Sequence, residues 1–203
     1  GEGGLILTDD EDLYFKMDCY HDHGHIHSKK HDRGEEGKFG LGVNFRLSEL
    51  QGALGVVALD KMPAALEKLR KTKKRIIDSV KDTGITARPM HDPEGDTASH
   101  LIFMLPSPEA ALSFRRTAGE AGTGFSIISE NTWHYAKHWK ALEEMGEKDI
   151  FGTRSPSYAH ETMAGTEAVL SRAVMTGLNI NMSDGEIERI INSVRSGAET
   201  ALR

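Results

Sequence analysis

The apolar residues between positions 48 and 82 recur with the period of a helix. One stripe has the spacing i, i+3, i+4, i+7 and consists of Leu50, Ala53, Leu54 and Val57. Ser48 and Gln51 have the spacing of a capping box, in which each side chain bonds the other's backbone amide. A second stripe follows Pro63 and consists of Leu66, Leu69, Ile76, Ile77 and Val80. The pattern predicts one helix from Ser48 and another from Pro63 to about residue 82, capped by Gly84.

Beyond Gly84, short apolar runs alternate with helical segments. The runs predict strands at residues 85–88, 101–105, 125–128 and 174–180, and the segments predict helices at 108–121, 161–172 and 183–201. Ser183 and Glu186 open the last helix with a second capping box. Residues 130–160 favour loops with one short helix at 139–145. We therefore expect residues 63–203 to form a small α+β domain with a core of its own.

The first sixty residues have a weaker pattern. Residues 5–8 favour a short strand, and Asp9 or Asp10 can cap a helix over residues 11–20. The stretch 21–42 is rich in His and Gly without periodicity, which is typical of a functional or mobile loop. A piece of this size cannot bury its own apolar faces. We expect residues 1–62 to pack as an appendage, in a chain of mixed α/β class.

The composition narrows the classes of partner. The net charge of −6 and the aromatic content of 6% among 203 residues argue against nucleic acid, which attracts basic or stacking surfaces. The apolar runs are too short to cross a membrane. The single cysteine, Cys19, cannot form an internal disulfide and is expected to lie in the core. A cytoplasmic protein fits these features.

Three motifs in order carry a family resemblance. Residues 1–10, GEGGLILTDD, resemble the stretch after the cofactor lysine in the DegT/DnrJ/EryC1/StrS family of sugar aminotransferases. Residues 42–53, GVNFRLSELQGA, resemble the G-x-N-x-R-x-S-E-L-Q-x-A signature of that family. Residues 170–172 and the helix start at 182–183 are similar to its C-terminal end. The resemblance covers the whole length of the chain.

This resemblance implies the C-terminal portion of a fold type I pyridoxal-phosphate-dependent transferase. Residues 1–62 would be a remnant of the large cofactor-binding domain, and residues 63–203 the small C-terminal domain. The family's cofactor lysine would lie upstream of Gly1, so we expect this chain alone to be inactive and without linked cofactor. The implied enzyme is a homodimer that moves an amino group from glutamate to a keto sugar or nucleotide sugar, as in polysaccharide biosynthesis.

Two alternatives stay open at this point. In a sister reaction of the same family, cofactor-dependent sugar dehydration, a histidine replaces the lysine. The deciding position would lie upstream of Gly1. The chain could also be a stand-alone binding or structural module without a cofactor, which would expose the apolar face of the helix after Ser48.

The signature supplies two candidate binding residues. In the family, the asparagine that matches Asn44 reaches the cofactor phosphate of the neighbouring subunit, and an amide N–H suits a phosphate oxygen. Asn44 could instead only shape a turn. Arg46 can hold the carboxylate of glutamate in two parallel hydrogen bonds. It could equally pair with Glu49 at the surface.

The histidine-rich loop supplies the remaining candidates. Alternate histidines in the run from 21 to 27 would share one face of an extended chain and could ligate zinc, but zinc sites typically have a second ligand cluster elsewhere. A solvated, mobile loop is the stronger interpretation, so we predict no metal site. The family has a His-Gly pair here in a loop near the substrate, which makes His23 and His25 candidate substrate-binding residues. Neighbouring Lys and Arg residues would suit an anionic sugar. His134 and Tyr135 lie where the family places sugar contacts.

Overall fold

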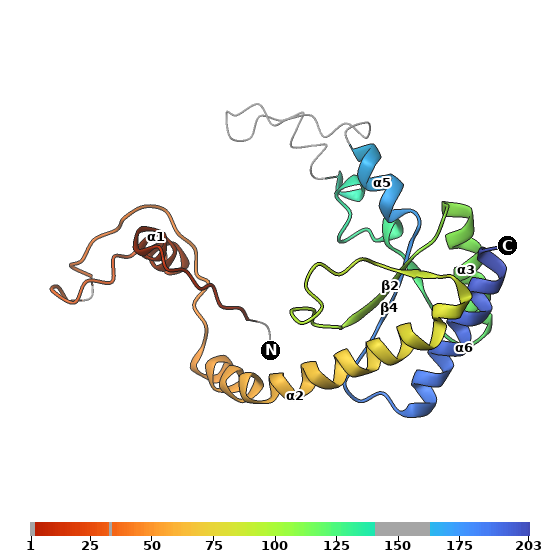
Figure 1. The fold of residues 1–203 in the computed structure, drawn as a ribbon. Helices are drawn as coiled ribbons and strands as arrows, with labels where there is room; N and C mark the ends of the chain where they lie inside the picture. Colours follow the sequence, from red (N-terminus) through yellow and green to blue (C-terminus); the bar gives the residue numbers. More distant parts are fainter. Residues whose placement is uncertain (1–2, 33, 141–162) are drawn as a thin grey trace. The chain divides into compact units, whose positions relative to one another are not determined.

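The computed structural model describes residues 3–32, 34–140 and 163–203 (Figure 1). The chain divides into two compact units, Gly1–Pro63 and Ala64–Arg203. The boundary falls inside helix α2, which extends over Glu49–Val80. No helix in the described residues is long and apolar enough to cross a membrane.

The second unit contains a four-stranded antiparallel sheet. Its strands are β1 (Thr86–Ala87), β2 (His100–Met104), β3 (Ser126–Ile127) and β4 (Ala173–Gly177), in the order β1-β2-β4-β3. The central pair sets the register, with Leu101 opposite Thr176 and Phe103 opposite Val174. Each strand predicted beyond Gly84 overlaps one of the observed strands, so the sequence pattern located all four strands of this sheet. The antiparallel pairing agrees with the predicted α+β class.

Two helices pack on this sheet and close the core. They are α3 (Pro108–Glu120) and α6 (Asp184–Ala201), which lie side by side (Figure 1). The side chains with no or almost no exposed area include Ile76, Val80, Leu101, Phe103, Leu105, Phe114, Val174 and Val194. The apolar positions of α2, α3, α6 and the central strands therefore meet in one hydrophobic core.

The helix starts of this unit follow the predicted caps. The Ser183 hydroxyl accepts from the Glu186 amide at 3.3 Å, and a Glu186 carboxylate oxygen accepts from the Ser183 amide at 2.7 Å. The predicted capping box is thus confirmed, and it opens α6. Gly84 ends the turn after α2 with a φ of 80°, a left-handed conformation that glycine adopts without steric cost. Helix α5 (Ala164–Leu170) lies inside the predicted helix 161–172.

Two element predictions were wrong. Helix α2 is continuous through Pro63 instead of starting there. Proline lacks the N–H of one helical hydrogen bond, but good helix formers on both sides continue the helix past it. Residues 5–8 form no strand, because in the described residues they have no neighbouring strand to complete their hydrogen bonds. The helix predicted at 139–145 extends into residues 141–162, outside the described part.

The first unit is built on helix α1, Glu11–His21, which follows its N-cap Asp10. The polar stretch after α1 turns back on the end of the helix. The Val43 amide donates to the Tyr20 carbonyl and the Phe45 amide to the His21 carbonyl, both at 2.9 Å. A Cβ at Gly24, where φ is 78°, would lie 2.0 Å from the Gly40 carbonyl oxygen, so only glycine fits. Residues 43–45 are thereby held against the end of α1, where Cys19 is buried as expected.

Candidate functional site

The candidate site is centred on Asp22, the residue that follows α1. Asp22 pairs with Asn44 in an isolated antiparallel bridge, and only 7% of its surface is exposed. Asn44 and Arg46 are exposed beside it. The backbone therefore brings the first residue of the histidine loop next to the two polar residues of the GVNFRLSELQGA signature.

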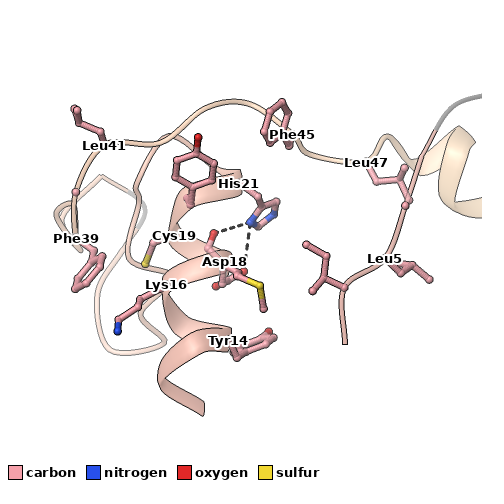
Figure 2. Close-up of a pocket in the computed structure, with 15 residues that line it drawn as sticks. Leu5, Tyr14, Lys16, Asp18, Cys19, His21, Phe39, Leu41, Phe45 and Leu47 are labelled. Carbon is pink, nitrogen blue, oxygen red and sulfur yellow. Dashed lines mark hydrogen bonds and ion pairs between the residues drawn. The ribbon is translucent and has the colours of Figure 1, made fainter. Parts of the chain in front are cut away.

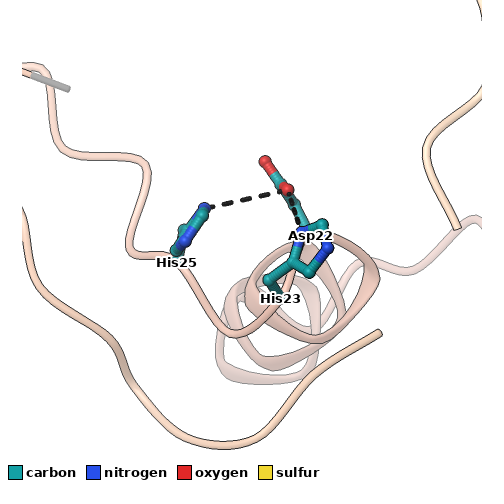
Figure 3. Close-up of side chains that lie close together, drawn as sticks. All are labelled: Asp22, His23 and His25. Atoms are coloured by element: carbon teal, nitrogen blue, oxygen red, sulfur yellow. Dashed lines mark hydrogen bonds and ion pairs between the residues drawn. The ribbon is translucent and has the colours of Figure 1, made fainter. Parts of the chain in front are cut away.

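The Asp22 carboxylate is shared by several nitrogen-bearing side chains. Nδ1 of His23 lies 3.0 Å from one carboxylate oxygen, and Nε2 of His27 lies 3.1 Å from the other. Nδ1 of His25 lies at 3.7 Å, and Figure 3 shows both His23 and His25 turned toward the same oxygen. Nε of Arg46 approaches that oxygen at 3.4 Å. One buried carboxylate thus joins the loop to the signature.

These contacts stabilise the charged forms of the groups. Hydrogen bonds with His23 and His27, followed by the positive charge of Arg46, hold the pKa of Asp22 well below its usual value. The pKa of His27 is raised, first by its hydrogen bond with Asp18 at 2.7 Å and then by the bond with Asp22. The imidazolium of His27 is therefore favoured between two carboxylates.

Asn44 has a fixed side-chain orientation. Its Oδ1 accepts from the backbone amide of Arg46 at 3.3 Å and from Nε of Arg46 at 3.1 Å. A guanidinium can only donate, so the oxygen end of the amide must face Arg46. The NH2 end of Asn44 is then the end that can donate to a bound anion. In the described residues, Arg46 forms its ion pair with Asp22 and not with Glu49.

Asp22, His23 and His25 meet one requirement of a metal site. Each offers one ligand atom, and these atoms all lie within 4.8 Å of one another. The guanidinium of Arg46, however, approaches the same Asp22 oxygen as the two imidazoles. A cation bound there would be repelled by Arg46 and would have to displace its contact with the carboxylate. The arrangement suits an anion better than a metal ion.

An apolar cavity of about 1160 Å³ lies beside α1 in the same unit. Its lining includes Leu5, Ile6, Tyr14, Phe39, Leu41, Phe45 and Leu47, and Figure 2 shows several of these side chains around the helix. Nδ1 of His21 at its edge lies 2.6 Å from the Asp18 carbonyl oxygen. Most of the apolar lining side chains are exposed, so the cavity is an open hollow of the first unit.

The other two predicted substrate residues belong to the second unit. His134 is exposed, and its backbone amide donates to the Asn131 side chain at 2.8 Å. Tyr135 is 3% exposed and donates its hydroxyl to Glu167 at 2.8 Å. Lys137 donates to the same carboxylate oxygen at 2.8 Å. The hydroxyl of Tyr135 thus has a partner within the protein, while the side chain of His134 is accessible.

Sequence reasoning missed Asp22 and His27 as members of the site. Both lie in the histidine run, but the family signature does not mark them. The signal in the sequence was the position of Asp22 just beyond the predicted helix 11–20 and among four histidines, where a carboxylate would attract cationic neighbours. The pairing with residues 44 and 46 depends on the backbone bridge, which no local pattern reveals.

The comparisons place the chain in a known family. Residues 1–195 match the DegT/DnrJ/EryC1/StrS aminotransferase family, to which the chain therefore belongs. A UDP-4-amino-4,6-dideoxy-N-acetyl-beta-L-altrosamine transaminase from Helicobacter pylori is 32% identical over 102 residues, which cover 50% of this chain and 26% of the relative. A GDP-4-keto-6-deoxy-D-mannose 3-dehydratase from Escherichia coli O55:H7 is 37% identical over 93 residues, which cover 40% of this chain and 24% of that relative.

Solved structures share the fold. Helicobacter pylori PseC, an aminotransferase involved in the biosynthesis of pseudoaminic acid, has a TM-score of 0.66 at 20% identity, covering 95% of this chain and 47% of its own. The sugar aminotransferase CalS13 from Micromonospora echinospora has a TM-score of 0.65 at 18% identity, covering 93% of this chain and 46% of its own. The chain thus spans about half of these structures and a quarter of the two relatives matched by sequence. The fold predicted for a portion of such a transferase is confirmed.

Proposed function

We propose that the whole protein is a pyridoxal-phosphate-dependent aminotransferase that moves an amino group from glutamate to a keto sugar or nucleotide sugar. This chain would supply its C-terminal half. The observation that carries the proposal is the arrangement of Asn44 and Arg46 in the family signature. The amide of Asn44 is oriented to donate, and an arginine beside it is held by a buried carboxylate.

The residues present fit a pyridoxal phosphate. Its phosphate accepts hydrogen bonds, and the NH2 end of Asn44 is a donor on an exposed segment. Pyridoxal phosphate, when bound, supplies the electron-withdrawing ring that allows an amino group to be exchanged. The resemblance assigns the anchoring lysine to the part that precedes residue 1, and it assigns Asn44 to the site of the neighbouring subunit. The chain would then complete the partner's site in a homodimer.

Arg46 would bind the amino donor. A guanidinium fork holds a carboxylate in two parallel hydrogen bonds, and glutamate carries two carboxylates. His23 and His25 face Asp22 from the adjoining loop and would contact the sugar substrate. The accessible His134 fits a sugar contact of the second unit. Tyr135, which is 3% exposed and donates its hydroxyl to Glu167, would instead support the loop that carries His134.

The exposed apolar surface of the first unit supports the assembly. Leu50, Leu54 and Val57, the predicted stripe of α2, are 73%, 58% and 50% exposed. A stable monomer seldom leaves a continuous apolar face of this kind in water. We infer that residues 1–62 belong to a larger domain and contribute to the homodimer contact.

Sugar dehydration is the second candidate function. The 37% identity to the Escherichia coli dehydratase over 93 residues favours it as much as the transaminase match favours transfer. Both reactions use the signature, and they differ at the lysine position. Asn44 and Arg46 therefore support either reaction. Amino transfer in addition needs Arg46 to bind the amino donor.

One experiment tests the proposal. The whole protein is loaded with pyridoxal phosphate and mixed with glutamate in the absence of a sugar. Formation of 2-oxoglutarate with conversion of the cofactor aldehyde to its amine form is the expected result. A protein that binds the cofactor but leaves glutamate unchanged would contradict the amino-transfer proposal. A protein that binds no pyridoxal phosphate would contradict both candidates.

A further inference from the structure

We propose that Asp22 is a positioning residue of the amino-donor site, whose carboxylate holds the Arg46 guanidinium ready for a substrate carboxylate. This inference rests on the proposed function, because it assigns Asp22 to the donor step of that reaction. The family signature begins twenty residues later and does not include Asp22. The geometry that points to it is the cluster around a single buried carboxylate.

The location of Asp22 separates it from an ordinary surface aspartate. Its side chain is 10% exposed, whereas the side chain of Arg46 is 42% exposed. The acid is therefore held within the protein while its arginine partner faces solvent. A carboxylate in such a place directs a long, flexible side chain better than an exposed partner can, because burial and its bonds with His23 and His27 restrict its own rotation.

Asp22 and Asn44 both contact Arg46, and neither contact uses the end of the side chain that would bind a substrate. Asp22 approaches Nε at 3.4 Å, and Oδ1 of Asn44 accepts from the same Nε at 3.1 Å. Both contacts thus use the inner nitrogen of the guanidinium. The two outer Nη groups form the end-on fork that matches a carboxylate. An arginine held by Nε presents this fork in one orientation.

Asp22 also links the fork to the substrate loop. The same carboxylate accepts from His23 and faces His25, as Figure 3 shows. Loss of its charge would release Arg46 and the imidazoles together. The backbone bonds that hold Asn44, from Val43 and Phe45 to the end of α1, do not depend on this carboxylate. Donor binding should therefore respond to Asp22, and cofactor retention should not.

Helix α1 contains a matched control. Asp18 also accepts a hydrogen bond from His27, at 2.7 Å, but it forms no contact with Arg46 in the described residues. Asp18→Asn removes one carboxylate bond to His27, as Asp22→Asn does, and leaves the fork of Arg46 in place. Any effect that the two variants share belongs to His27 and the loop. An effect unique to Asp22→Asn belongs to Arg46 or the imidazoles of His23 and His25.

The test is a double-mutant cycle in the whole, cofactor-loaded protein. We expect Asp22→Asn to raise KM for glutamate by roughly 5- to 30-fold, with kcat and cofactor retention within about twofold of wild type. Asp18→Asn should change KM by less than about twofold, and Asp22→Glu should restore part of the loss. In an Arg46→Ala background, Asp22→Asn should add less than about twofold, because its partner is already gone.

The outcomes separate this inference from the function on which it rests. A wild-type protein that does not react with glutamate would overturn both. An active wild type with an unchanged Asp22→Asn variant would overturn only the role of Asp22. The same holds if Asp22→Asn loses the cofactor or fails to fold, because its role would then be structural. Equal effects in the wild-type and Arg46→Ala backgrounds would also contradict action through Arg46.

Discussion

Oδ1 of Asn44 accepts a hydrogen bond from Nε of Arg46 at 3.1 Å. The backbone amide of Arg46 donates to the same oxygen at 3.3 Å, and both donors require an acceptor, so the NH2 end of the Asn44 amide is the end that can donate. The two polar residues of the signature are therefore one structural pair. Arg46 orients Asn44, and Asn44 in turn shares Nε of Arg46 with Asp22.

The Asn44 amide can be tested with two substitutions in the whole protein. Asn44→Ala should weaken cofactor retention by about 1–3 kcal/mol, the usual range for the loss of a hydrogen bond to a charged group. Asn44→Asp keeps an acceptor for Arg46 but cannot donate, and it places a negative charge near the phosphate. It should therefore weaken retention more than Asn44→Ala does. Equilibrium dialysis of pyridoxal phosphate measures both, and equal retention in all three proteins would exclude a phosphate contact.

The crossing of α3 and α6 gives a prediction for stability. A Cβ at Gly197 would lie 2.7 Å from the ring of the fully buried Phe114. Overpacking of this kind costs about 1–3 kcal/mol, which exceeds the gain of about 1 kcal/mol from replacing a helical glycine by alanine. Gly197→Ala should therefore lower the free energy of unfolding by about 1 kcal/mol.

The same helix provides the control for this substitution. At Gly185, near the start of α6, an added Cβ would have no neighbouring atom within 4 Å. Gly185→Ala should raise the free energy of unfolding by up to about 1 kcal/mol. Urea unfolding of the 203-residue chain compares the two variants. A stabilised Gly197→Ala variant would contradict the close contact between α3 and α6.

The pair of carboxylates around His27 predicts a pH dependence. Asp18 and then Asp22 raise the pKa of His27, and the His21 ring lies 6.0 Å away. A raised pKa means that protonated His27 stabilises the fold fully below about pH 6.5, the value of an unperturbed histidine, and that this contribution is lost as the pH rises through the folded pKa. NMR titration should show a pKa for His27 above about 6.5. Asp18→Asn should lower it, and an unchanged value would contradict the hydrogen bond.

Zinc should not bind at Asp22, His23 and His25. The guanidinium of Arg46 faces the same carboxylate oxygen and opposes a cation there. We expect the melting temperature to stay constant and no protons to be released when zinc is added. A zinc-dependent rise that disappears in His23→Ala but persists in His134→Ala would show that a metal site exists.

The predictable features of this fold are the local ones. The capping boxes at Ser48 and Ser183 located two helix starts, because such boxes involve residues only three positions apart. The buried run that became β2 stood out by its apolar content. In contrast, the strand predicted at residues 5–8 depended on a pairing partner that the described residues do not supply. Helix α2 continues through Pro63 because the segments on both sides favour a helix, and the proline alone predicts a helix start.

The site was predictable only in part. Asn44 and Arg46 were identified from the signature, and their roles stay predictions. The local pattern gave no means of foreseeing that Asp22 would reach both, since the bridge joins residues 22 positions apart and requires Gly24 to approach Gly40 closely. Long-range backbone contacts of this kind arise from the fold as a whole.

The central claim is that this chain completes the cofactor site of a neighbouring subunit through Asn44. The decisive measurement uses heterodimers of the whole protein, in which Asn44→Ala subunits are paired with subunits that lack the cofactor lysine. If Asn44 acts across the interface, one site carries both defects and the other is intact, so the heterodimer should have half of the wild-type activity. A heterodimer as inactive as the Asn44→Ala homodimer would mean that Asn44 serves its own subunit, and the claim would be wrong.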